Sequence, residues 1–123
     1  MAVPILKQNQ FLIASIQAAL SDKDLIQLRD DLAELVGRHR ARGVIVDVTA
    51  LDVLDSFATR TLRAIAYMTK LRGADTVIVG IQPDVAFSMV QLGLTLENVA
   101  TALDLEEGLS FLQRRLEDGR HGS

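Results

Sequence analysis

The chain has 123 residues, 49% of them hydrophobic, carries a formal net charge of −3 and contains no cysteine. Disulfides and thiolate metal sites are therefore excluded, and the lack of a Lys/Arg cluster interleaved with aromatic residues argues against nucleic-acid binding. Neither a signal peptide nor an apolar run of the roughly 20 residues needed to span a bilayer is present, so we expect a cytoplasmic protein without a membrane partner.

Short apolar runs alternate with amphipathic segments along the chain, which is typical of an α/β domain. Leu6 and the apolar residues 11–14 flank a polar stretch at 7–10 and indicate an N-terminal hairpin. The sequence Ser-Asp-Lys-Asp at 21–24 resembles a capping box. Leucines at helical spacing follow it, so a first helix is expected up to Gly37.

Two buried strands are predicted next, from Gly43 to Val48 and from Thr76 to Ile81. The helix between them is expected to end before Gly73. The inner face of that helix should carry Ala58, Leu62, Ile65, Met68 and Leu71. A third helix is predicted to begin at Pro83 and to stop at Gly93, since proline suits a helix start and glycine a helix end.

A last helix is predicted to begin after Asp104, with leucines on one face. The chain is thus interpreted as one domain at residues 1–117 and a flexible tail at 118–123. Two strand-helix-strand connections require right-handed crossovers, so we expect a mostly parallel mixed sheet covered by about four helices. The edge where these strands end should carry residues 49–57 and Gln82-Pro83, and ligands or partners commonly meet α/β sheets there.

Residues 44–58 are the most informative segment, because a β-branched run ends in acidic residues and then delivers one serine to a helix start. Unpaired N–H groups in a first helical turn could hold a phosphate on Ser56. Spacing alone favours the simpler interpretation that Asp55 and Ser56 cap the helix. Asp47, Asp52 and Asp55 could also bind a hard cation, although such residues more often cap turns.

The sequence offers no constellation typical of an enzyme. His39 lies near the end of the first helix and His121 lies in the tail, so no His-based triad or metal motif can be assembled. None of the eight glycines forms a phosphate-binding loop, and the nucleophile motif Gly-x-Ser-x-Gly is absent. We therefore expect no catalytic residue, no cofactor and no metal.

Three segments carry a resemblance to a known family. The motif Asp55-Ser56-Phe57 after a hydrophobic strand, followed by the sequences at 68–74 and 76–83, resembles a STAS domain, the fold of bacterial anti-sigma factor antagonists. The similarity runs from Pro4 to about Leu116. Phe-Ala-Thr-Arg follows the serine here, whereas direct binders of anti-sigma factors have small residues and glycine. The chain is therefore most similar to the RsbS-type scaffold subunits of stressosomes.

This resemblance implies a phosphorylation switch at Ser56. In the family the matching serine is the target of a partner kinase, so the unmodified protein should hold an RsbT-like switch serine kinase and release it on phosphorylation. The partner-binding residues would be Asp52, Asp55, Phe57, Thr59 and Arg60. RsbR-like STAS paralogues are further expected partners. Apolar surface on the helices favours self-association, at least as a dimer.

Three alternatives stay open. The first is a direct binder of an anti-sigma factor. The second is a receiver-like domain that accepts a phosphoryl group on Asp47, at the end of its third strand. A receiver needs an acidic pair after its first strand and a lysine after a later one, where this chain has Lys7-Gln8 and Gly80-Ile81-Gln82. The third is a STAS accessory subunit of a transporter or lipid-trafficking complex.

Overall fold

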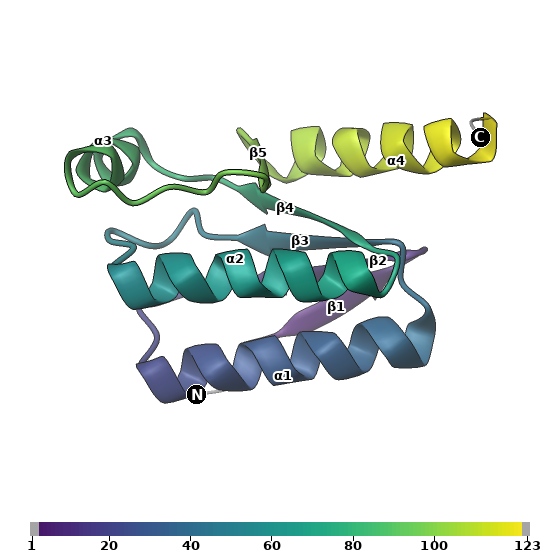
Figure 1. Ribbon diagram of the computed structural model, residues 1–123, viewed down its shortest axis with the longest axis horizontal. Coiled ribbons are helices and arrows are strands. Elements are labelled where there is room, and N and C mark those ends of the chain that lie inside the picture. Colours follow the sequence, from purple (N-terminus) through teal and green to yellow (C-terminus); the bar gives the residue numbers. More distant parts are fainter. Residues whose placement is uncertain (1–2, 122–123) are drawn as a thin grey trace.

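The computed structural model describes residues 3–121, which form one five-stranded sheet flanked by helices (Figure 1). The elements, in chain order, are β1 (Ile5–Gln8), β2 (Phe11–Ser15), α1 (Asp22–His39), β3 (Gly43–Asp47), α2 (Ser56–Leu71), β4 (Asp75–Val79), α3 (Pro83–Gln91), β5 (Ala100–Ala102) and α4 (Leu105–His121). Strands and helices alternate after the first hairpin, which confirms the predicted α/β class.

The strand order is β1-β2-β3-β4-β5, with β1 antiparallel to β2 and every other neighbouring pair parallel. The predicted mixed sheet with an N-terminal hairpin is therefore confirmed. Asn9 makes the hairpin turn with a φ of 55°, a left-handed conformation that asparagine tolerates. Because β2, β3 and β4 are parallel, their carboxyl ends lie at one edge of the sheet, where α1, α2 and α3 begin (Figure 1).

Each face of the sheet has its own hydrophobic core. Alternate residues of a strand point to opposite faces, so Val44 and Val46 pack toward α1, α2 and α3 whereas Ile45 faces α4. Leu112 and Leu116 of α4 cover that second face. Burial of each such aliphatic side chain stabilises the fold by roughly 1.5–3 kcal/mol. The three central strands, β2, β3 and β4, therefore contain runs of consecutive apolar residues because both of their faces are covered.

The predicted starts of α1 and α3 are confirmed. At α1, the amide of Asp24 donates to the Ser21 hydroxyl over 3.1 Å, and the Ser21 amide donates to the Asp24 carboxylate over 3.4 Å. Pro83 occupies the first turn of α3. Helix α1 continues past Gly37 and ends at His39, because Arg40 adopts the left-handed conformation that terminates it.

Two details of the helix faces differ from the prediction. Leu71 was expected on the inner face of α2, yet it is 70% exposed. Thr69 takes an inward position instead, and its hydroxyl lies 2.6 Å from that of Thr76 on β4 in a buried pair. Two polar side chains that hydrogen-bond to each other can be buried without leaving an unpaired donor. The prediction assigned only apolar residues to the inner face of α2, so it overlooked Thr69.

The structure also differs from the prediction in the C-terminal helix and in the last strand. Helix α4 runs to His121 and so includes the first part of the segment at 118–123; residues 122–123 lie outside the described range. Strand β5 was not predicted from the sequence. In the described part of the chain, no helix has the length and apolar character that a bilayer span requires.

Candidate functional site

The loop between β3 and α2 crosses the carboxyl edge of the sheet and places Ser56 at the first position of α2. Asp55 is the cap of this helix: its Oδ1 accepts from the amide of Ala58 over 2.8 Å, and its carbonyl accepts from the amide of Thr59 over 2.9 Å. Capping therefore depends on Asp55 alone. The Ser56 side chain is exposed and makes no hydrogen bond within residues 3–121, so its hydroxyl is accessible.

Hydrogen bonds at this edge join two neighbouring loops, the one after β3 and the one after β4. Oδ1 of Asp47 accepts from both the amide and the hydroxyl of Thr49, over 2.9 and 2.6 Å. The side-chain amide of Gln82, just before α3, donates to the Thr49 carbonyl over 2.6 Å. Gly80 has a φ of 81°, and a Cβ atom there would overlap the Thr49 hydroxyl. Gln82 was predicted at this edge from the sequence, whereas the close contact between Gly80 and Thr49 was not.

The residues predicted to bind a partner fall into different environments. Asp52, Asp55 and Arg60 are exposed around Ser56, as a contact surface requires. Phe57 is half-buried and packs against the core under α2, so only part of its ring is accessible.

Thr59 does not fit the predicted role. Its side chain is 0% exposed, and within the described residues its hydroxyl is buried without a hydrogen-bond partner. A docked protein cannot touch this side chain unless α2 moves. We therefore leave Thr59 out of the contact surface proposed below. The family resemblance that indicated Thr59 and Arg60 as partner-binding residues could not tell which of them faces the sheet.

An apolar feature beside Ser56 was missed by the sequence analysis. A small cavity of about 70 Å³ lies under the loop, lined by residues of α1, α2 and the two preceding loops. Val53 borders it and is 60% exposed, although it is apolar. Val53 directly precedes the buried Leu54 in this loop, and no periodicity there indicated its exposure. An exposed valine next to the serine adds an apolar contact to an otherwise acidic surface.

Asp47 does not have the surroundings of a phosphoacceptor site. Its Oδ1 is engaged by Thr49 in a local turn. The sequential strand order differs from the order 2-1-3-4-5 of the doubly wound sheet that receiver domains use. In the part of the chain that the structure describes, no three His, Cys, Asp or Glu side chains are grouped to hold a metal ion. The receiver-like alternative is therefore wrong for this fold.

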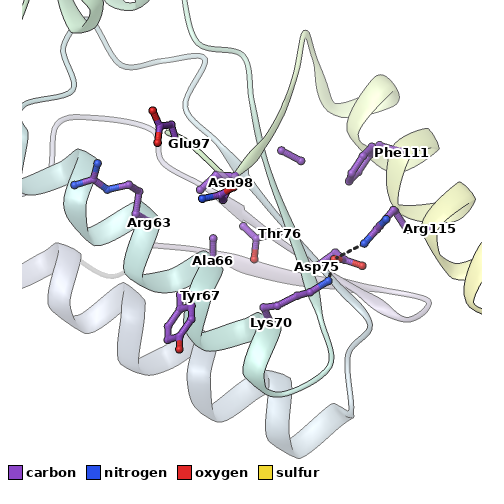
Figure 2. A pocket seen from close by; sticks show the side chains of 12 residues that line it. Arg63, Ala66, Tyr67, Lys70, Asp75, Thr76, Glu97, Asn98, Phe111 and Arg115 are labelled. Atoms are coloured by element: carbon purple, nitrogen blue, oxygen red, sulfur yellow. Dashed lines mark hydrogen bonds and ion pairs between the residues drawn. The ribbon is translucent and has the colours of Figure 1, made fainter. Parts of the chain in front are cut away.

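A larger cavity, of about 500 Å³, lies between α2 and α4 beside the outer edge of β4 (Figure 2). Asp75 in its wall accepts from Lys70 over 2.9 Å and, more weakly, from Arg115 over 3.4 Å. Burial would raise the pKa of the Asp75 carboxyl, but the hydrogen bonds from these two cations outweigh it and hold the pKa below its usual value. The lining charges thus largely neutralise one another, and Ser56 is not part of this cavity.

Comparisons with known proteins give consistent results. A family model described as STAS domain matches residues 2–108. RsbS from Moorella thermoacetica, in a variant with one serine replaced by glutamate, is 35% identical with a TM-score of 0.81, and the match covers 94% of this chain and 97% of that one. A chain from the stressosome, described as a signal integration and transduction hub, is 33% identical with a TM-score of 0.74, covering 92% and 98% of the two chains.

A longer protein is also similar. The RsbT co-antagonist protein RsbRA of Bacillus subtilis is 29% identical over 83 residues, which is 68% of this chain but 30% of RsbRA. The chain therefore spans less than a third of the length of that relative.

Proposed function

Because the chain belongs to the STAS domain family and is similar to stressosome proteins, we propose that it binds an RsbT-like serine kinase and releases it when Ser56 is phosphorylated. It is an RsbS-like member of the anti-sigma factor antagonist family. In this proposal it acts by binding and has no catalytic turnover of its own. RsbR-like paralogues, such as RsbRA, are its proposed partners in a larger assembly.

The exposed position of Ser56 is the observation that carries the proposal. Its hydroxyl is free because Asp55 does the capping, and it sits on the edge where a partner can approach (Figure 1). The contact surface consists of Asp52, Val53, Asp55, Phe57 and Arg60 around Ser56. A kinase that docks here brings its own active site next to the hydroxyl that it modifies.

The charge balance at this edge supports an effect on the partner rather than on the fold. Phosphorylation adds about −1.5 to −2 charge at neutral pH. The start of α2 and the exposed Arg60, one turn further on, favour that charge. Asp52 and Asp55 repel it. Since these effects oppose one another at an exposed site, the fold should change little, whereas a partner surface that is apolar or acidic would meet a doubly charged group.

Phosphorylation by a purified RsbT-like kinase with ATP, mapped by mass spectrometry, tests the proposal. We expect modification of Ser56, loss of it in Ser56→Ala, and normal modification in the matched variant Ser110→Ala, whose serine is exposed on α4. Kinase binding measured by surface plasmon resonance should persist in Ser56→Ala and weaken at least tenfold on phosphorylation. Efficient labelling of Ser56→Ala, or equal kinase affinity before and after phosphorylation, would contradict the proposal.

The same preparation tests one of the two remaining alternatives, a direct binder of an anti-sigma factor. Such a protein would bind the anti-sigma factor in its unmodified form and would not retain the kinase after mixing.

Light scattering at micromolar concentration, alone and with an RsbR-like paralogue, tests the expected assembly. A monomer under both conditions would contradict it.

A further inference from the structure

The end of the molecule opposite Ser56 carries a depression lined by arginines. Helices α1 and α2 both finish there, next to the starts of β3 and β4 (Figure 1). The depression has a volume of about 540 Å³, and its wall contains Arg40, Arg42 and Arg72. The other lining residues are Val36, Gly37, Ala41, Leu71 and Gly73. It therefore holds three positive charges and no carboxylate, in a protein whose net charge is −3.

The three arginines are held by the backbone rather than by ion pairs. Arg40 and Arg72 are the C-terminal caps of α1 and α2, and the amide of Arg40 donates to the Val36 carbonyl. Arg42 is fixed by its backbone, which donates to the Gln10 carbonyl over 2.8 Å and accepts from the Asp75 amide over 3.1 Å. Within residues 3–121 none of the three guanidinium groups forms an ion pair with a carboxylate.

A structural explanation accounts for only part of this charge. Cations near a helix C-terminus are favoured because each terminus carries roughly half a negative charge. Two termini therefore offset about one of the three positive charges. Asp75 and Asp118 border an adjoining depression together with Arg42. Asp75 there is already shared by Lys70 and Arg115, and Asp118 makes no ion pair with Arg42. About two positive charges thus remain uncompensated at one concave site.

The geometry of the lining indicates the class of ligand. Guanidinium groups bind phosphate through paired N–H donors, and several of them around one concavity fit an anion with more than one phosphoryl group. Gly37 lets the Arg72 guanidinium lie against the end of α1, because a Cβ atom on Gly37 would overlap that guanidinium. No aromatic ring lines the depression, so the groups that it offers to a ligand are mainly guanidinium N–H donors suited to phosphoryl oxygens. The volume lies within the range of small-molecule sites.

We propose that the depression formed by Arg40, Arg42 and Arg72 is a binding site for small oligophosphates, which it recognises through their phosphoryl groups and not through a base. The site is independent of the kinase-release function, and it lies at the opposite end of α2 from Ser56. A bound oligophosphate would bridge the ends of α1 and α2 and stabilise the fold.

Calorimetric titration of the full chain with inorganic tripolyphosphate, at 150 mM salt, tests the proposal. We expect saturable 1:1 binding that Arg72→Gln weakens at least tenfold, since a lost charge-assisted hydrogen bond has an effect of that order. Arg72→Lys keeps the charge but loses the planar fork, so its affinity should fall between the two. Arg114→Gln removes the same charge from an exposed position on α4 outside the depression, and it should change the affinity less than twofold.

Further titrations identify which part of the ligand the site recognises. ATP and GTP should bind within about threefold of tripolyphosphate, because the phosphoryl groups supply the contacts. If Arg72→Gln does not fold, Arg42→Gln provides the same test, since Arg42 contributes to the fold through its backbone. Absence of saturable binding, or equal weakening by Arg114→Gln and Arg72→Gln, would overturn the proposal. So would a result in which Arg72→Gln abolishes self-association while tripolyphosphate does not bind, because the occupant would then be a second copy of the chain.

Discussion

Replacement of Gly80 by alanine should destabilise the fold through two separable effects. Gly80 follows β4 with a φ of 81°, a left-handed conformation that costs a non-glycine residue about 1–2 kcal/mol. The new Cβ would also overlap the Thr49 hydroxyl and come within 3.0 Å of the Thr49 Cβ. Overpacking of this kind costs about 1–3 kcal/mol. We expect the free energy of unfolding to fall by about 2–5 kcal/mol in total.

A matched glycine isolates the backbone contribution. Gly73 has a φ of 86°, and a Cβ atom there would meet nothing within 4 Å. Gly73→Ala should therefore show only the conformational cost, about 1–2 kcal/mol, in urea denaturation monitored by circular dichroism. Thr49→Ala in the Gly80→Ala background should recover part of the difference. If Gly80→Ala and Gly73→Ala were equally destabilised, the close packing between the β3–α2 and β4–α3 loops would not exist as described.

Three other substitutions probe the site and the cavity of Figure 2. Ser56→Asp should change the free energy of unfolding by less than about 0.5 kcal/mol in urea, because the helix start and the nearby aspartates act in opposite directions; a larger loss would show that the switch acts through the fold. Thr59→Val should be neutral or stabilising by up to about 1 kcal/mol, since it removes an unpaired buried hydroxyl, and it should leave kinase binding unchanged. Asp75→Asn should cost about 0.5–1 kcal/mol at neutral pH. Because the folded pKa of Asp75 lies below its usual 3.8, this difference should persist above about pH 5 and vanish as the pH falls through the folded pKa; a pH-independent difference would show that packing, not charge, is responsible.

Much of the fold could be predicted because its signals are local. The capping box at Ser21 and the proline at position 83 fixed two helix starts correctly. The Val-Ile-Val runs within β3 and β4 are apolar because both faces of the sheet are covered. Strand β5 was missed because it has three residues, Ala-Thr-Ala, which are too few for a period and too small for a clear apolar signal.

The candidate site could be predicted only in part, for a physical reason. Ser56 and its cap Asp55 depend on a strand end and a helix start, which the sequence shows. The burial of Thr59 depends on which side of α2 faces the sheet, and the exposure of Val53 depends on the path of a loop. The arginine depression depends on the parallel arrangement of α1 and α2, which brings Arg40 and Arg72 together from positions 32 residues apart in the sequence. Contacts of this kind appear only once the topology is known.

The position of Ser56 at the start of α2 supports the proposal that a phosphate there acts on a partner without unfolding the domain. Ser56 is the first residue of α2 (Figure 1), so the dipole of that helix favours a negative charge there by about 0.3–1 kcal/mol. The exposed aspartates at 52 and 55 oppose that charge, and the stability of the domain changes little. A docked kinase removes water from the same edge, and a charge buried against an unsuitable surface then costs several kcal/mol. A loss of about 4 kcal/mol weakens a complex roughly a thousandfold. We therefore expect phosphorylation of Ser56 to change the isolated domain little and to weaken the proposed kinase complex strongly.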